Sequence, residues 1–377
     1  MLYTIVSFVI LATGCQSSPQ ATASHTPGVT PVPARVTPSV GASVSRLLEP
    51  ETISSPTPAP SGPTWSSEYG VQIHGCGQPP AEAIELVTRA GFRWVKQQVR
   101  WDEIEGVRGA FAWKCIDDVV DLAHAKGLKV LLSVTTAPRW AKTWTAGEAG
   151  PPDADLLAGF LTDMVKRYQG KIHAVEVFNE PNLAVEWGDN LNPGYYVQML
   201  IAAYQAIKRA DSQVMVISAG LAPTRWNDWG TAMDDLEYMR QIGPSAAYYA
   251  DCIGAHFNDG TSSPLAPGSP LEQLVTSYRR LTGQSKPICL TEFGIATPAG
   301  GRTPKGFRWA ARTTPEQQAQ WLADGVRWAG LHPGTLRLVI IWNLNYYSDD
   351  SDPNSLYSLW TPQGMRPAYD ALRTVVK

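Results

Sequence analysis

The sequence has little charge, and the charge that it has is almost balanced. Charged residues make up 17% of the 377 residues and the formal net charge is −3, whereas soluble domains carry roughly 25% charged residues. No broad basic surface is indicated, so we expect no nucleic-acid partner. The low charge, with 30 prolines, 32 glycines and 14 tryptophans, is typical of an exported, loop-rich globular protein.

The chain also lacks an apolar run long enough to cross a bilayer at its start. Residues 1–14 are largely apolar, but a membrane-spanning helix needs about 20 residues, so this run matches the core of a signal peptide. The run Leu-Ala-Thr-Gly-Cys over 11–15 resembles a bacterial lipobox. We interpret 1–15 as a lipoprotein-type signal peptide with Cys15 as the lipid anchor. Because no Lys or Arg precedes the apolar run, the signal is atypical, and an ordinary secretory signal is the alternative.

Aromatic residues are absent from 16–64, a stretch that contains ten of the prolines. Without aromatic residues this segment cannot bury a core, so we expect a disordered Pro/Ser/Thr-rich linker. The linker would tether a folded domain, residues 65–377, to the outer face of a membrane or to the cell surface. Contact with the membrane is expected only through the lipid on Cys15, and we expect a monomer.

From Trp65 onward, short β-branched runs alternate with longer amphipathic stretches, which is the pattern of βα units on a parallel sheet. Eight strands are predicted, at Gly70–His74, Arg93–Val99, Lys129–Thr135, His173–Asn179, Val214–Ala219, Cys252–His256, Ile288–Glu292 and Leu336–Leu344. Eight helices are predicted, at Ala81–Ala90, Ile116–Lys126, Asp153–Tyr168, Tyr195–Ala210, Met233–Gln241, Leu271–Leu281, Pro315–Ala329 and Pro367–Val376. Eight such pairs predict an α/β fold, a single (β/α)₈ (TIM) barrel. A doubly wound open sheet is the alternative, although no Gly-rich phosphate loop follows the first strand.

Two glutamates at strand ends are the main candidates for chemistry. Glu180 follows the fourth predicted strand and Glu292 ends the seventh, and these strands face each other across an eight-stranded barrel. Charged groups in apolar strands are costly unless they are used, and two carboxylates about 5–5.5 Å apart suit retaining glycoside hydrolysis. A metal site is disfavoured because no His-x-x-x-His or Asp-rich cluster lies near either residue. A glutamate paired structurally with Arg or Lys is the remaining alternative.

The motifs around these glutamates resemble those of clan A glycoside hydrolases, which include the cellulase-like family 5 and family 39. The resemblance covers Tyr69 to Val376 and rests on Phe-Asn-Glu-Pro-Asn at 178–182, Leu-Thr-Glu-Phe-Gly at 290–294, Trp-Asp-Glu-Ile-Glu at 101–105 with Gly109, Phe111 and Trp113, and Ala-Pro-Arg-Trp-Ala at 137–141. It implies a retaining (β/α)₈ hydrolase of β-linked oligo- or polysaccharides that needs no metal and no other cofactor.

The resemblance also implies roles for individual residues. Glu180 would be the acid/base and Glu292 the nucleophile, and Asn179 would hydrogen-bond the sugar 2-hydroxyl. The other implied substrate-site residues are His256, near the nucleophile, Trp342, as the floor of the sugar site, Trp140 and Lys96. Lys96 stands where related enzymes commonly carry Arg, so support of the nucleophile is expected to fall to Arg100 or to a water. Asn258 stands where they often carry an aromatic residue.

Two rival functions remain at this point. The first is a non-catalytic carbohydrate-binding surface lipoprotein on a TIM-barrel scaffold, and the second is a metal-dependent barrel hydrolase.

Six tryptophans in predicted loops are candidate sugar platforms, with about half expected to pack on the core: Trp140, Trp144, Trp187, Trp226, Trp229 and Trp309.

Four cysteines remain after Cys15, and three pairings are open to them. A Cys76–Cys115 bridge is plausible because both residues fall near the same end of the predicted barrel. Cys252 and Cys289, which begin adjacent strands, are interpreted as ordinary buried thiols.

Overall fold

The computed structural model describes residues 66–144, 149–228, 230–298, 303–304, 306–346 and 352–376. The predicted signal peptide, the predicted linker, Cys15 and Trp229 lie outside the described residues. Among the helices that the structure describes, none combines the length and the apolar character that a membrane span requires.

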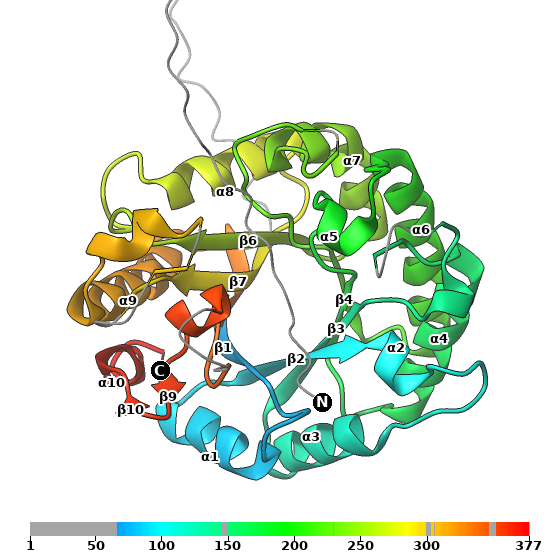
Figure 1. Cartoon of the computed structure of the whole chain (residues 1–377), viewed down its shortest axis with the longest axis horizontal. Coiled ribbons are helices and arrows are strands. Elements are labelled where there is room, and N and C mark those ends of the chain that lie inside the picture. Colours follow the sequence, from blue (N-terminus) through cyan, green and yellow to red (C-terminus); the bar gives the residue numbers. More distant parts are fainter. Residues whose placement is uncertain are drawn as a thin grey trace, which may run out of the picture. The chain divides into compact units, whose positions relative to one another are not determined.

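Eight parallel strands form the inner layer of the domain, surrounded by helices (Figure 1). The strands are β1 (Glu68–Ile73), β2 (Trp94–Arg100), β3 (Lys129–Thr135), β4 (Ala174–Val177), β5 (Met215–Ser218), β6 (Ile253–Asp259), β7 (Ile288–Ile295) and β8 (Leu336–Ile341). They pair in the order β5-β4-β3-β2-β1-β8-β7-β6, and a parallel bridge between Ile217 and Cys252 connects the two ends of that order. The predicted (β/α)₈ barrel is therefore confirmed, and the open sheet is excluded because this bridge joins the two strands, β5 and β6, that would be the edges of an open sheet.

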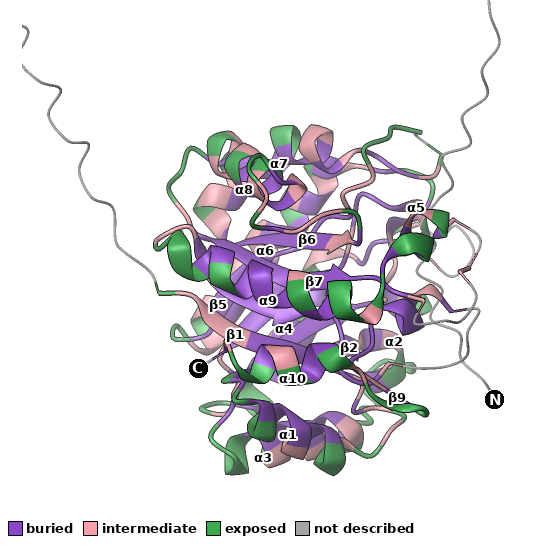
Figure 2. Ribbon diagram, turned by 90° about the vertical axis from the view of Figure 1, so that its left-hand side faces the viewer, coloured by how far each residue is buried: buried purple, intermediate pink, exposed green. Residues whose placement is uncertain are grey.

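The principal helices follow the strands in the order that the sequence predicts. They are α1 (Pro80–Ala90), α3 (Lys114–Ala125), α4 (Ala154–Arg167), α6 (Pro193–Ala210), α7 (Asp235–Tyr249), α8 (Pro270–Leu281), α9 (Pro315–Leu331) and α10 (Pro367–Arg373). Two single-turn helices, α2 (Trp101–Ile104) and α5 (Ala184–Trp187), lie in the loops after β2 and β4. The helices present exposed residues to solvent and buried ones to the strands (Figure 2).

Helix α7 is longer than predicted. The prediction ends at Gln241, before a Gly-Pro pair, but the helix continues through Pro244 to Tyr249. Pro244 is exposed, so the backbone carbonyl that loses its partner inside the helix lies on the solvent side. A Cβ on Gly243 would lie 2.7 Å from the Leu281 carbonyl oxygen of α8. Glycine is therefore needed here for the close packing of α7 on α8.

The interior of the barrel is layered, and this layering determines where polar groups can gather. Near the starts of the strands, the inward side chains form an apolar cluster of Trp94, Leu131, Ala174, Met215, Ile217, Cys252, Cys289, Leu338 and Ile340. Two residues further along a strand, the next inward side chain is polar: Lys96 follows Trp94, and Glu176 follows Ala174. Because side chains alternate with a period of two, the polar layer lies towards the C-terminal ends of the strands.

Two disulfides link neighbouring parts of the barrel. Cys76 and Cys115 are paired, which confirms the expected bridge between the loop after β1 and the start of α3. Cys252 and Cys289 are also paired, with their Cα atoms 5.9 Å apart, so the interpretation of these two as free thiols is wrong. Parallel pairing of β6 with β7 places their starts side by side, within the range that a disulfide spans.

One buried carboxyl group outside the polar layer is expected to make folding depend on pH. Asp235 at the start of α7 is 4% exposed and accepts a 3.0 Å hydrogen bond from the Tyr278 hydroxyl of α8. Burial, with a contribution from neighbouring Asp234, raises the pKa of Asp235 to about 7. A folded-state pKa above that of the unfolded chain stabilises the protein below about pH 4, and this contribution is lost as the pH rises through about 7.

We therefore predict that Asp235→Asn removes part of the pH dependence of stability. The amide keeps an oxygen that accepts the Tyr278 hydrogen bond but does not ionise. Between pH 4 and pH 7 the wild-type free energy of unfolding should fall relative to the variant, by on the order of 3 kcal/mol. Urea unfolding at a series of pH values measures this difference, and parallel curves for the two proteins would contradict the prediction.

Candidate active site

The two predicted catalytic glutamates meet at the C-terminal end of the barrel. Glu180 follows β4, and Glu292 lies in β7. One oxygen of each carboxylate and one ring nitrogen of His256 all lie within 4.8 Å of one another. This separation is close to the roughly 5–5.5 Å of retaining glycosidases and well below the roughly 6.5–9.5 Å of inverting ones.

His256 of β6 lies between these carboxylates and is fully buried. Its Nδ1 is 2.9 Å from Glu180 Oε1 and 3.5 Å from Glu292 Oε2, and its Nε2 is 3.6 Å from Glu176 Oε1. Burial lowers the pKa of His256, but the three carboxylates outweigh burial and raise it to about 10. The imidazole is therefore a cation at neutral pH.

Gly220, just after β5, makes room for this histidine. A Cβ on Gly220 would lie 2.1 Å from the His256 ring, so no other residue fits there without moving the ring. The Gly220 N–H donates to Glu176 Oε1 over 3.1 Å, and its carbonyl accepts from the Glu180 N–H over 3.1 Å. Gly220 thus hydrogen-bonds both the buried Glu176 carboxylate and the backbone of Glu180.

Lys96 lies beside Glu292 and has no exposed surface. Its Nζ is 2.9 Å from Glu176 Oε2 and 3.7 Å from Glu292 Oε1, and it donates to the Thr291 carbonyl over 3.1 Å. Burial raises the pKa of Glu176, but Lys96 and His256 more than compensate and hold it well below its usual range. Glu176 is therefore the ionised partner of both cations.

The side chains around Glu292 orient its carboxylate by a hydrogen bond and offset its negative charge with two cations. Burial raises the pKa of Glu292, and the His256 and Lys96 cations oppose that rise. Asn258 at the end of β6 donates its Nδ2 to Glu292 Oε2 over 3.1 Å. The expected support from Arg100 is absent from these contacts, because its guanidinium pairs with Asp102 and Glu103. The charge support that was expected from Arg100 comes from Lys96.

The backbone after β4 turns sharply around Glu180. Phe178 and Glu180 have φ values of 74° and 36°, a left-handed region that is costly for residues with a Cβ. The Phe178 ring is buried edge-on against Trp187 at 5.5 Å, which anchors this turn. Asn179 lies between the two strained residues and is 5% exposed.

The predicted tryptophan platforms occupy different environments. Trp342 is 6% exposed, and its ring meets His74 edge-on at 5.7 Å. Trp140 is half-buried, donates to the Glu105 carbonyl and packs edge-on against Trp101. Trp187 is fully buried and belongs to the core, whereas Trp226 is 36% exposed.

Four site residues are missing from the sequence-based assignment: Glu176, Glu186, Gly220 and Tyr357. Glu176 could have been identified from the sequence, since a charged residue flanked by Val175 and Val177 inside an apolar strand is unusual. Tyr357 comes from a distant loop and packs on Gly294 of β7, where a Cβ would lie 2.7 Å from its ring. Burial raises the pKa of its hydroxyl, and the charges of Glu292 and Glu180 contribute to the rise. No local pattern reveals the contact with Gly294.

The donor atoms of Glu180, His256 and Glu292 are close enough together to be considered as metal ligands. A histidine ligates a metal only as the neutral imidazole, and here three carboxylates hold His256 in its protonated form. The Lys96 ammonium adds a second positive charge beside Glu292. The donor set therefore fits an ion-pair network better than a cation site.

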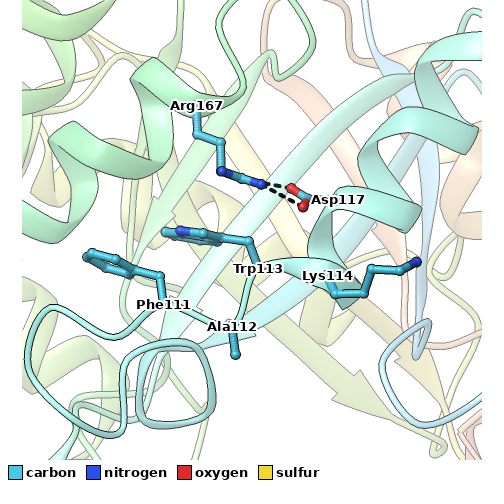
Figure 3. Close-up of a pocket in the computed structure, with 6 residues that line it drawn as sticks. All are labelled: Phe111, Ala112, Trp113, Lys114, Asp117 and Arg167. Carbon is cyan, nitrogen blue, oxygen red and sulfur yellow. Dashed lines mark hydrogen bonds and ion pairs between the residues drawn. The ribbon is translucent and has the colours of Figure 1, made fainter.

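A surface pocket of about 550 Å³ lies apart from this network and is lined by Phe111, Ala112, Trp113, Lys114, Asp117 and Arg167. In it the Phe111 and Trp113 rings are stacked, and Arg167 pairs with Asp117 (Figure 3). Trp113 stacks in turn on buried Phe160. The two rings therefore extend the hydrophobic core to the surface, and the charged groups of the pocket are already paired, Arg167 with Asp117 and Lys114 with Asp118.

We predict that Lys96→Met destabilises the fold by about 3–5 kcal/mol, because the buried Glu176 carboxylate loses the ammonium group with which it pairs. The double variant Lys96→Met/Glu176→Gln should recover most of that loss, since both partners are then neutral. Urea unfolding measures both effects. Lys114→Met is the matched control, because its pair with Asp118 is exposed and should contribute less than about 1 kcal/mol. A single variant as stable as wild type would contradict the prediction.

Comparison with known proteins places this geometry in a family. The family model described as cellulase (glycosyl hydrolase family 5) matches residues 58–329. Among solved structures, a family 39 glycoside hydrolase from Bacteroides cellulosilyticus WH2 aligns with a TM-score of 0.60 at 16% identity, over 83% of this chain and 64% of that one.

Two further structures share the fold. An exo-β-1,4-mannosidase from Opitutaceae bacterium strain TAV5 aligns with a TM-score of 0.60 at 14% identity, over 82% of this chain and 59% of that one. An endo-β-1,4-glucanase from Xanthomonas axonopodis pv. citri aligns with a TM-score of 0.57 at 14% identity, over 82% of this chain and 98% of that one. The chain thus spans less than two thirds of the family 39 enzyme and of the mannosidase. With the family model matching well over half of its length, the chain belongs to the cellulase family, glycosyl hydrolase family 5.

Proposed function

We propose that this protein hydrolyses β-linked glycans with retention of configuration, using Glu180 as acid/base and Glu292 as nucleophile. The observation that carries the proposal is the approach of the two carboxylates to within 4.8 Å around His256. A binding protein needs no such pair, because repulsion between two carboxylates this close together is costly unless it is used.

In the first step, Glu292 attacks the anomeric carbon as the bond to the leaving oxygen breaks, and Glu180 transfers a proton to that oxygen. His256 contacts Oε1 of Glu180, which leaves Oε2 to carry the proton. The Lys96 and His256 cations favour the ionised form of Glu292 that attack requires.

In the second step, Glu180 removes a proton from water, and the oxygen of that water attacks the anomeric carbon of the glycosyl–Glu292 ester. The carbon–Oε bond breaks, the sugar leaves with its original configuration, and Glu180 is protonated again. His256 remains a cation throughout, so its charge offsets whichever carboxylate is ionised.

The substrate is proposed to be a β-linked oligo- or polysaccharide. The family model is named for cellulase, and the enzymes that share the fold include a β-1,4-glucanase and a β-1,4-mannosidase. One further glycoside hydrolase with this fold was solved in complex with cellopentaose. We propose that the reaction needs no metal, so activity should survive a chelator.

We further propose that the protein is exported, anchored by a lipid on Cys15 and monomeric. The apolar run before Cys15 and the aromatic-free stretch after it support export and the lipid anchor. A tether of 49 residues has a reach of roughly 40 Å, which would hold the barrel clear of the surface and give it access to long glycans.

We predict that Glu292→Ala and Glu180→Ala each lower kcat/KM on a responsive glycan by at least about 10⁴-fold. For Glu180→Ala the loss should be much smaller on an aryl glycoside with a good leaving group, which needs no proton, and azide should restore turnover.

A mechanism-based fluorosugar should label Glu292 in a peptide detected by mass spectrometry. Wild-type-like hydrolysis by either variant would contradict the assignment. Glycan binding without turnover by the wild type would favour a carbohydrate-binding protein.

We predict that Cys15→Ser abolishes lipid attachment. In a bacterial host fed a labelled fatty acid, the wild-type chain should carry the label and partition with the membrane fraction. The variant should lack the label, and fractionation then shows where it resides. A wild-type chain without label, released into the medium, would support an ordinary secretory signal.

A further inference from the structure

Asn179 lies beside the acid/base residue with only half of its amide satisfied. Its Nδ2 donates to Glu186 Oε1 over 3.2 Å. Its Oδ1 is buried and has no hydrogen-bond partner. A buried acceptor without a donor costs about 1–3 kcal/mol, so this oxygen is poised for a donor that arrives with a ligand.

Glu186 is held in place by a short, well-anchored element. It belongs to the single turn α5, whose last residue, Trp187, is fully buried. The N–H of Ala184 donates to the Thr231 carbonyl over 2.9 Å. Val185 is 39% exposed, whereas Glu186 is half-buried. The turn therefore directs Glu186, and not its neighbour, towards Asn179.

The electrostatics of Glu186 agree with a place inside the site. Burial, and then the nearby Glu180 charge, raise its pKa to about 7, while the Asn179 amide and Arg100 oppose the rise. Either protonation state leaves an oxygen that accepts from Asn179. The contact is therefore kept on both sides of neutral pH.

We propose that Glu186 is a positioning residue that determines which face of the Asn179 amide meets the substrate. By accepting from one of the two Nδ2 hydrogens, it fixes the amide with Oδ1 on the other side, so a sugar hydroxyl that donates to Oδ1 satisfies the buried acceptor. The proposal rests on the proposed function and on the role that the family resemblance implies for Asn179, a hydrogen bond with the sugar 2-hydroxyl. A sugar without that hydroxyl leaves Oδ1 unpaired and loses the interaction.

The test compares an aryl β-glycoside that the wild type hydrolyses with its 2-deoxy analogue. The quantity measured is kcat/KM for the parent glycoside divided by kcat/KM for its 2-deoxy analogue. Comparing this ratio between the variant and the wild type cancels the difference in intrinsic reactivity between the two substrates. In Glu186→Ala the amide is free to turn, and the ratio should fall about tenfold, equivalent to about 1.4 kcal/mol. Glu186→Gln keeps an oxygen acceptor and should stay within about threefold of the wild-type ratio.

Val185→Ala in the same turn is the matched control and should leave the ratio unchanged. A merely structural role for Glu186 predicts equal losses on both substrates, and an unchanged ratio in Glu186→Ala overturns the inference. If Glu186→Gln behaves like Glu186→Ala, the charge and not the acceptor matters, which also overturns it. A wild type that hydrolyses no β-glycoside defeats the proposed function instead, and the inference with it.

Discussion

The buried contact between the Lys96 ammonium and the Glu176 carboxylate is the interaction on which the site depends. A charge inside a barrel is tolerated only when it is paired, and Glu176 pairs with both Lys96 and His256. Lys96 in turn contacts Glu292, and His256 contacts Glu180, so these two cations connect Glu176 with both glutamates. Glu180 and Glu292 are thus fixed relative to each other by a residue that contacts neither of them directly.

The layering of the barrel explains why this network forms at one end only. The strands start with inward apolar residues, and Lys96 and Glu176 come two residues after Trp94 and Ala174. A polar layer deeper in the barrel would have no access to substrate, and one further out would exchange its ion pairs for water. Glu180 and Glu186 lie at the half-buried level. There a carboxylate can reach a ligand and still interact strongly with the charged groups of the site.

Much of the fold could be predicted because it depends on local patterns. The eight strands follow from β-branched runs, and helix ends such as Gly91, with φ 90°, follow from the left-handed conformation that glycine adopts readily. The end of α7 was predicted eight residues too early, at Gln241 instead of Tyr249. The cause is tertiary, since the Gly-Pro pair that is typical of a helix end is accommodated here by packing against α8. The Cys252–Cys289 bridge was also missed, because it depends on the register of β6 with β7 and not on the spacing of the two cysteines.

The sequence by itself determined the barrel, the strand ends and the two glutamates that meet there, because strand periodicity and strand order imply those positions. Only the tertiary structure decided how the glutamates are supported. Lys96 became the buried cation beneath Glu292, Arg100 turned to Asp102 and Glu103, and Glu186 reached Asn179. These contacts join side chains from different strands and loops across the barrel, and their energies depend on burial and distance, which a linear sequence does not contain.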